Sequence, residues 1–379
     1  MIDTGTWHLA TKRAEFLDLQ SDWDRIFHEN ARHSPFLSWG WVDAWLRHIA
    51  RVHELRIIYW RDAGGITQYI LPLHRPRNRF GFGSGSTMLV CSYGLDSSDN
   101  LGCLCVPELE DQSSELTADA IDYFFDRSDS ISLRFLDSTG SFPWRLQEAM
   151  QSSGRKIKIR PDSTCPTAVL PASWGEFLRQ LSSNFRSQVR RSYKQVGGDG
   201  QPKFRFVDPT ESESFATELI RLNRSRIRAK GRTSSLESDG FRNFLSEVIP
   251  YLASQGISWM DTIERDGEVL GAALNFVHGD TVYFYMGGFD DKASKIRPGT
   301  ALFALVIQRG IERGHSRYDF LRGDELYKYR WSATDVMMHS VAIYPRGFLR
   351  AHLASAADDI YLTARKFLRY ARRQIRGRD

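Results

Sequence analysis

The stretch ISWMDTIERDGEVLGAALNFVHGDTVYFYMGGFD, residues 257–290, decides how the second half of the chain folds. It is rich in β-branched and aromatic residues, which favour strands. Two turn sequences interrupt it, RDGE at residues 265–268 and HGDT at residues 278–281. A Gly-Asp or Asp-Gly pair between apolar runs is typical of a hairpin. The stretch therefore predicts a meander of three strands.

The segments on both sides of this meander predict alternating helices and strands. Before it we expect a strand at 167–171, a helix at 173–196, a strand at 203–208, and helices at 211–231 and 240–256. After it we expect a helix at 300–314, a strand at 317–321, a polar turn with a short helix, and a strand at 337–345. This order is similar to that of the GNAT acyltransferase fold.

In the GNAT fold, the pyrophosphate of the acyl donor sits where the helix after the meander begins. Backbone N–H groups and the helix dipole favour an anion there. The corresponding segment is KASKIRPGTALF, residues 292–303, in which Pro298 suits a first helical turn and Gly299 lets a ligand approach the backbone. We expect Arg297, Gly299 and Thr300 to bind the donor. The alternative is an ordinary Pro-Gly helix start under a solvated loop.

Basic residues are concentrated on the helix predicted at 173–196. Arg186, Arg190 and Arg191 cluster there, with Lys194 beyond them, and NRSRIRAKGR at residues 223–232 is a second basic segment. Arginine pairs bidentately with phosphate or carboxylate, so two such segments favour an anionic cleft, with Arg186 and Arg190 contacting substrate. The alternative is a solvated helix face.

The first half of the chain also predicts interleaved helices and strands. A seam rich in Pro, Ser and Thr near residues 160–171 is typical of a domain boundary. We therefore expect α/β domains at 1–160 and 166–346, each with its own mixed sheet, and a tail at 347–379. The tail ends in a basic amphipathic helix, residues 358–379, which we expect to dock on the protein, with an anionic membrane as the alternative.

Composition gives weaker constraints. The 379 residues include 51 Lys and Arg against 46 Asp and Glu, a net charge of +5 that permits an anionic partner without requiring one. The four cysteines lack a paired C-x-x-C spacing, so we expect reduced thiols and no metal site. The first residues lack the apolar core of a signal peptide, and no apolar run reaches the roughly 20 residues of a membrane span. These features indicate a cytoplasmic protein.

Several segments resemble, in order, those of CelD-like GNAT acetyltransferases linked to cellulose and exopolysaccharide synthesis, which are relatives of the Fem-type peptidoglycan aminoacyltransferases. They are SPFLSWGWVDAWLRH (34–48), YILPLHR (69–75), SSDNLGCLCVP (97–107), SNFRSQVRRSYKQV (183–196), RSRIRAKGRTSSL (224–236) and residues 297–331, which contain a Gly-Asp-Glu turn followed by Tyr-Lys. The resemblance implies two tandem GNAT-like domains, with the donor site in the second and acceptors in the cleft between them.

The resemblance also points to FLRGDELYKYRW, residues 320–331, as the catalytic turn. We predict that Lys328 contacts the donor's phosphates or the developing oxyanion, with Asp324 and Tyr327 placing it or relaying a proton. Asp324 is also expected to cap the short helix that follows. Arg330 is expected on the donor and Trp331 on the substrate. The alternative is that the two aromatic rings pack while the cations reach solvent.

The chain is thus predicted to be an acyl-CoA-dependent N- or O-acyltransferase, most simply an acetyltransferase. Its acceptor would be a saccharide or another molecule of the cell envelope. Two rivals remain: a Fem-like transferase that takes its donor from aminoacyl-tRNA, and a non-catalytic scaffold for polysaccharide synthesis. The sequence specifies neither the acceptor nor the oligomeric state.

Overall fold

The computed structural model describes residues 5–50, 52–76, 87–92, 97–126, 129–136, 140–196, 202–229, 231, 234–347, 349 and 353. Within these ranges, no helix has the length and apolar character needed to cross a membrane. The basic helix expected at residues 358–379 lies outside the described residues.

The first half interleaves helices and strands, as predicted. Its elements are β1 (Thr6–Ala10), α1 (Arg13–Asp18), α2 (Gln20–Glu29), η1 (Pro35–Leu37), α3 (Trp39–His48), β2 (Val52–Arg61), β3 (Thr67–Pro76), β4 (Thr87–Leu89), β5 (Leu104–Cys105), η2 (Pro107–Gln112), α4 (Ser113–Phe124), β6 (Ile131–Leu136), α5 (Phe142–Ala149) and η3 (Gln151–Ser153).

The second half has the predicted order, including the three-stranded meander β9–β11. Its elements are β7 (Arg155–Val169), α6 (Trp174–Gln180), α7 (Ser183–Lys194), β8 (Lys203–Phe206), η4 (Pro209–Glu211), α8 (Ser212–Ala229), η5 (Ser235–Glu237), α9 (Asp239–Ser254), β9 (Ser258–Arg265), β10 (Glu268–His278), β11 (Thr281–Phe289), η6 (Asp291–Ile296), α10 (Pro298–Glu312), β12 (Arg317–Asp319), α11 (Leu326–Tyr329) and β13 (Thr334–Arg346). The helix expected at 173–196 is two helices, because the chain is extended at Leu181 and the Ser182 side chain caps α7.

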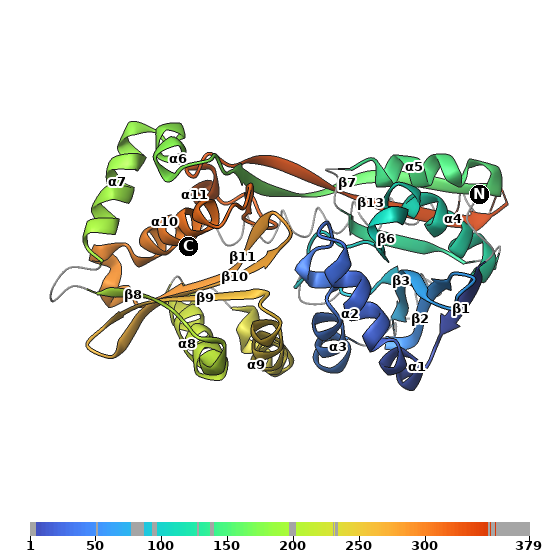
Figure 1. Cartoon of the computed structure of the whole chain (residues 1–379), viewed down its shortest axis with the longest axis horizontal. Helices are drawn as coiled ribbons and strands as arrows, with labels where there is room; N and C mark the ends of the chain where they lie inside the picture. The colour runs from blue at the N-terminus through green and yellow to red at the C-terminus, as the bar shows by residue number, and fades with distance from the viewer. Residues whose placement is uncertain are drawn as a thin grey trace.

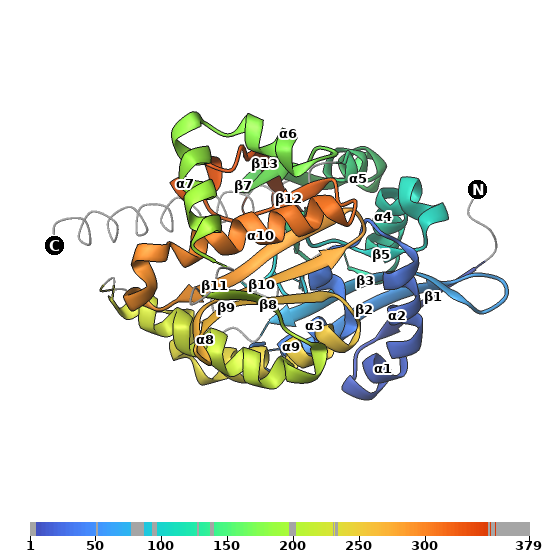
Figure 2. The same ribbon diagram turned by 60° about the vertical axis from the view of Figure 1, so that its left-hand side comes forward.

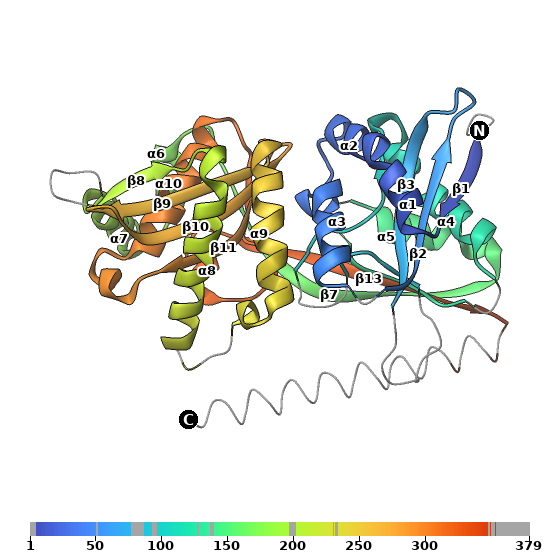
Figure 3. The same cartoon turned by 90° about the horizontal axis from the view of Figure 1, so that it is seen from below.

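One sheet runs through both halves, in the order β1-β2-β3-β4-β6-β13-β7-β12-β11-β10-β9-β8, with β5 beside β3. The expectation of two separate sheets is therefore wrong. The reason is the length of β7 and β13, which have 15 and 13 residues. At about 3.3 Å per residue such strands span roughly 40–50 Å, enough to reach from one lobe into the other. Figures 1 and 3 show this pair joining the two lobes.

The seam expected near residues 160–171 lies mostly inside β7. Two prolines do not end this strand. Pro161 sits where the register with β13 shifts, and Pro166 bonds through its carbonyl to the Phe320 N–H. Proline is tolerated at such places because no ladder N–H is required of it. The division of the chain into two domains stays a prediction.

Helices cover both faces of the sheet in the second half. In Figures 1 and 2, α8 and α9 lie on one face of β8–β11, and α10 lies on the other with α6 and α7 beside it. The first turn of α10 approaches the sheet closely, since a Cβ on Gly271 of β10 would lie 3.2 Å from Pro298 Cβ. The fold thus fixes the start of α10 against the meander.

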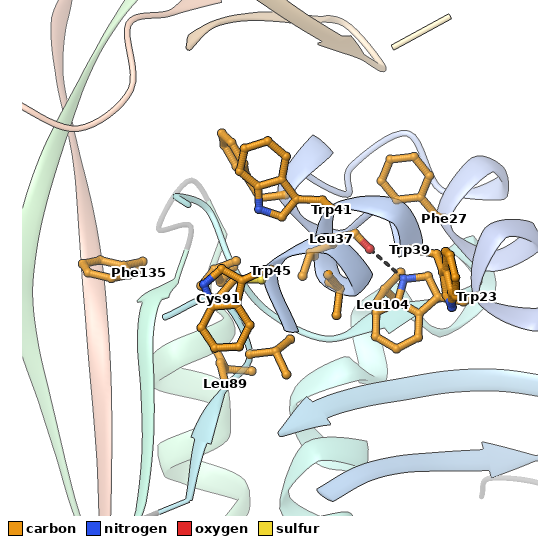
Figure 4. Packing of buried hydrophobic residues seen from close by; sticks show 14 of the residues in the cluster. Trp23, Phe27, Leu37, Trp39, Trp41, Trp45, Leu89, Cys91, Leu104 and Phe135 are labelled. Carbon is orange, nitrogen blue, oxygen red and sulfur yellow. Dashed lines mark hydrogen bonds between the residues drawn. The ribbon is translucent and has the colours of Figure 1, made fainter. Parts of the chain in front are cut away.

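The core of the first half is built around tryptophan. Trp23, Trp41 and Trp45 are fully buried (Figure 4). Each buried indole N–H that finds a partner also fixes a loop: Trp23 Nε1 donates to the Leu37 carbonyl at 2.7 Å, and Trp41 Nε1 donates to Ser98 Oγ at 2.9 Å. These bonds position the segments that face the second half.

The two halves pack directly through α3 and α9. A Cβ on Gly40 would lie 2.1 Å from the Tyr251 ring, and one on Gly240 would lie 2.6 Å from the His48 carbonyl oxygen. Only glycine allows helices to approach this closely. Glu247 of α9 also bonds to the His48 side chain at 2.6 Å. The relative placement of the halves is therefore fixed by side chains as well as by the sheet.

Candidate active site

The site begins where β11 and β12 part. The two strands pair in parallel only from Thr281 to Tyr283 of β11, although β11 continues to Phe289. On this side, no described strand covers the rest of β11, so its backbone forms an open edge. A bulge lies in the same region: Leu274 faces Met286 and Asn275 faces Phe284, which leaves Tyr285 as the extra residue.

The open edge leads to the first turn of α10. Phe289, at its end, lies against Gly299, where an added Cβ would be 3.3 Å from Phe289 Cε1. Pro298 has no N–H to offer, and the Thr300 N–H bonds to the Arg297 carbonyl at 2.9 Å. The Gly299 N–H has no partner among the described residues. One donor of the helix start is thus left for a ligand.

Cationic side chains gather at this helix start. Arg297 Nη1 and Arg330 Nη2 both donate to Gln188 Oε1, at 2.8 and 2.7 Å. Arg330 also lies 4.1 Å from the centre of the Phe185 ring, and Arg226 of α8 lies 4.2 Å from that of Phe289. Arg297 and Arg330 are therefore together, although more than thirty residues separate them. Arg226 was not predicted as a site residue. The basic segment 223–232, which contains it, is the sequence feature that could have indicated its role.

Lys328 is buried inside the turn between β12 and α11. It is 3% exposed, and its Nζ donates to the carbonyls of Leu321, Arg322 and Gly323 at 2.9, 3.0 and 3.2 Å. The Glu325 carboxylate lies 3.0 Å away. The structure thus places the ammonium group among loop carbonyls. Its contact with a donor stays a prediction.

The other residues predicted in this turn differ in position. Asp324 is exposed, and its expected role as a cap is wrong, because Glu325 is the N-cap residue and makes no side-chain cap bond. Tyr327 is 37% exposed, but one side of its ring packs on Phe303, with ring centres 5.7 Å apart, and this partial desolvation raises the pKa of its hydroxyl. Trp331 is 2% exposed and lies in the core rather than on a surface open to substrate.

The two arginines predicted to contact substrate lie along α7. Neither Arg186 nor Arg190 has an ion pair or hydrogen bond within the part of the chain that the structure describes. Arg190 borders a groove of about 290 Å³ between α6 and α7, floored by Trp174 and Leu178. No contact joins these two arginines to the pair at the start of α10.

A larger cavity, of about 680 Å³, lies between the two halves. Its charged lining residues are Arg32, Glu110, Asp111 and Arg145 from the first half and Asp280, Arg317 and Asp319 from the second. Uncharged polar groups, among them serine hydroxyls, line much of the remainder. Sequence reasoning did not find this site, because its lining comes from segments up to about 300 residues apart. Across the described residues, no group of His, Cys, Asp and Glu could hold a metal ion.

His33 forms part of the wall of this cavity. Its Nε2 accepts a hydrogen bond from the Cys105 N–H at 3.2 Å, so the neutral ring carries its proton on Nδ1. Burial lowers the pKa of His33 to about 3. The histidine is therefore neutral at physiological pH. Three of the four free cysteines, Cys91, Cys105 and Cys165, are buried.

Comparisons with known proteins agree with this geometry. Residues 183–329 match the family model of the acetyltransferase (GNAT) domain. The match covers β8–β12, the start of α10 and the turn that holds Lys328. The chain is also similar in fold to solved structures. One is FemX, at a TM-score of 0.60 and 12% identity, covering 85% of this chain and 95% of that one.

Two other solved structures have a similar fold. One is the C-terminal domain of a putative lysylphosphatidylglycerol synthetase from Agrobacterium fabrum, with a TM-score of 0.52, 11% identity, and coverage of 92% of this chain and 96% of that one. The other is a conserved protein of unknown function from Bacteroides thetaiotaomicron, with a TM-score of 0.53, 10% identity, and coverage of 89% and 100%. No curated protein sequence matches the chain.

These findings confirm the mixed α/β fold class and the prediction of a GNAT-type acyltransferase. Sequence identities of 10–12% to these structures show a shared fold, but they do not indicate the substrate of this chain. The comparisons do not test the CelD-like assignment, and they identify neither the donor nor the acceptor.

Proposed function

We propose that the protein transfers an acyl group, most simply acetyl, from acyl-CoA to an amine or hydroxyl of a saccharide acceptor. The observation that carries the proposal is the convergence of Arg297 and Arg330 on Gln188 at the start of α10. Two guanidinium groups sharing one neutral amide oxygen leave most of their positive charge uncompensated. A pyrophosphate displacing that amide would pair with both.

The open edge of β11 suits the rest of this donor. The pantetheine arm of CoA carries amide groups, which can hydrogen-bond to an unpaired strand edge as an added strand does. The edge runs from Phe284 to Phe289 and ends against Gly299. In this arrangement the phosphates lie at the helix start with Thr300 nearby, and the thioester lies near the bulge at Tyr285.

The cavity between the halves suits the acceptor. Its volume of about 680 Å³ is large enough for a saccharide, and its charged residues are of both signs. Tyr283 and Asp319 line the cavity and are paired across β11 and β12. The cavity thus adjoins the place where the strands part, so an acceptor bound there could reach a thioester at the bulge.

The reaction is a direct acyl transfer. The acceptor nitrogen or oxygen attacks the thioester carbonyl, the carbon–sulfur bond breaks, and the acceptor loses a proton as the CoA thiolate leaves. We propose that Tyr327 donates a proton to that thiolate, because a tyrosine hydroxyl is protonated at neutral pH and this one follows directly from the turn. Asp324 remains the proposed proton relay: its carboxylate takes the proton that the acceptor loses and returns it to the Tyr327 oxygen. A CoA donor would place the reaction in the cytoplasm.

The CelD-like resemblance narrows the acceptor to cellulose or exopolysaccharide chemistry within this proposal. A second candidate function is transfer from aminoacyl-tRNA. The cations of α7 favour it, since Arg186, Arg190, Arg191 and Lys194 have no ion partner among the described residues and could follow a phosphate backbone. The fold shared with FemX is compatible with either donor.

Thermal shift with acetyl-CoA, longer acyl-CoAs and bulk tRNA tests the donor. We expect acetyl-CoA to raise the melting temperature, since a ligand at 100 times its Kd stabilises by about 2.7 kcal/mol. Arg297→Gln and Arg330→Gln should each weaken acetyl-CoA binding about tenfold in calorimetry, the loss of one charge-assisted contact. Arg179→Gln on α6, an exposed arginine, is the matched control. A shift with tRNA alone would favour the second candidate, and no shift with either would contradict both.

A further inference from the structure

The RGDE turn after β12 is tied to the opposite half of the molecule through Arg322. Its Nε lies 2.6 Å from Asp99 Oδ1, and its backbone N–H donates to Asp99 Oδ2 at 3.0 Å. The guanidinium also donates to the Ser98 carbonyl at 3.0 Å and lies 3.9 Å from the centre of the Phe135 ring. One carboxylate of the first half therefore holds both the side chain and the backbone of this residue.

A second contact joins the same two segments. Asn100 Nδ2 donates to Asp319 Oδ2 at 3.1 Å, and Asp319 Oδ1 accepts the Leu321 N–H at 2.7 Å. Behind them, the Trp41 indole holds the Ser98 hydroxyl. The segment from Ser98 to Asn100 is thus fixed to the core of the first half and reaches across to the end of β12.

The turn has a backbone that requires such support. Leu321 has a φ of 56° and Gly323 a φ of 121°, and Asn100 on the facing segment has a φ of 50°. A branched residue such as leucine seldom adopts positive φ, and it does so where surrounding contacts over-determine the conformation. The Lys328 ammonium supplies contacts from within the turn. Asp99 supplies them from outside.

We propose that Asp99 is a positioning residue for the active-site turn, so that the first half of the chain completes the site carried by the second. Its two carboxylate oxygens hold Arg322 and thereby set the path of residues 320–323. The catalytic consequence rests on the proposed acyltransfer, because α11, with Tyr327, follows directly from this turn. The order of the turn itself does not depend on it.

The position of the contacts also links the turn to the cavity. Asn100 and Asp319 both line the cavity wall, and their hydrogen bond lies beside the Asp99–Arg322 pair. An acceptor held between the halves would therefore touch the same segments that set the turn. Loss of Asp99 should disturb catalysis more than donor binding. Arg297 and Gly299 lie at the start of α10, and the Arg330 side chain is held separately, by Gln188 and by the Phe185 ring of α7.

Hydrogen exchange on the full chain tests the structural part. Asp99→Asn keeps the shape and removes the charge, and we expect at least tenfold faster exchange in peptides covering residues 320–329. The matched control is Asp43→Asn, because Asp43 accepts two hydrogen bonds from Arg47 at 3.0 and 2.7 Å, is as buried as Asp99, and makes its ion pairs with Arg13 and Arg47 inside the first half. Control exchange at residues 320–329 should stay at the wild-type rate. Equal protection in Asp99→Asn and wild type would overturn the proposal.

Kinetics with acetyl-CoA and an amino-sugar panel, followed by thiol release, tests the catalytic part. We expect Asp99→Asn to lower kcat at least tenfold while the KM for acetyl-CoA changes less than threefold. A rise in KM with unchanged kcat would contradict positioning of the turn. If the wild type shows no transfer, the proposed function fails. The exchange result still decides whether the contact between Asp99 and Arg322, the clamp, orders the turn. If Asp99→Asn does not fold, Arg322→Lys replaces it, with the same exchange and kinetic criteria.

Discussion

Lys328 shows how one side chain can serve a site from inside the fold. Its Nζ has three hydrogens and meets three carbonyl oxygens, those of Leu321, Arg322 and Gly323. Three consecutive carbonyls point inward only because Leu321 and Gly323 have positive φ. The lysine and the unusual backbone therefore depend on each other. In this geometry Lys328 stabilises the backbone of the turn at residues 321–323.

Lys328→Met should destabilise the protein while keeping the length of the side chain. Three buried carbonyls would lose their donor, and an unsatisfied buried polar group costs about 1–3 kcal/mol. We expect a loss of at least 2 kcal/mol in the free energy of unfolding, measured by denaturant titration. Lys194→Met, on the solvent side of α7, should change it by less than 0.5 kcal/mol. A fully stable Lys328→Met variant with strongly reduced turnover would instead favour direct contact with the donor.

The start of α10 is the element that carries the proposed donor site. Three features meet there: the helix dipole, the Gly299 N–H, which has no partner within the described ranges, and the end of the β11 edge at Phe289. Arg297, at the N-cap, has a φ of 52°. That conformation turns the chain out of η6 into the helix, and the Arg297 side chain bonds to Gln188 of α7.

Gly299→Trp should abolish donor binding at this helix start by filling the space beside Phe289. We expect the Kd for acetyl-CoA to rise more than tenfold in calorimetry, with the melting temperature lowered only slightly because the position is half exposed. Gly299→Ala is the graded control, since its Cβ would meet Phe289 Cε1 at 3.3 Å, a close contact that a small ring movement relieves. Unchanged affinity in the Trp variant would move the donor site elsewhere.

The whole molecule behaves as two lobes sharing one sheet. β13 comes from the end of the described chain, yet it lies between β6 of the first half and β7. Without it, β6 and β7 would lose their common neighbour in the middle of the sheet. The first half therefore cannot complete its sheet until the second half has been made.

Two truncations test this dependence. A chain ending at Ser332 lacks β13 and should lose cooperative thermal unfolding or fail to remain in solution. A chain ending at Gly347 keeps β13 and removes only the residues beyond it, so it should still unfold cooperatively in calorimetry. A single sharp transition in the shorter chain, matching that of the longer one, would show that β13 is dispensable to the first half.

The sequence by itself determined the local elements of this protein. The hairpin turns of the meander and the Pro-Gly start of α10 are encoded within a few residues, and the structure has them where they were predicted. The order of strands and helices was enough for the fold class. Gly323 likewise has the positive φ that a sharp turn needs. Such features depend on short-range backbone preference, which a sequence displays directly.

Only the tertiary structure decided which distant residues meet. Three features join segments more than a hundred residues apart. They are the clamp between Asp99 and Arg322, the cavity between the halves, and the hydrogen bonds of Gln188 to Arg297 and Arg330. The burial of Trp331 and the inward course of Lys328 were also not evident, because an aromatic or basic residue beside a turn can face either way. The prolines of β7 suggested a boundary, whereas long-range pairing with β13 made a continuous strand. Contacts of this kind depend on tertiary packing, which a local sequence pattern does not specify.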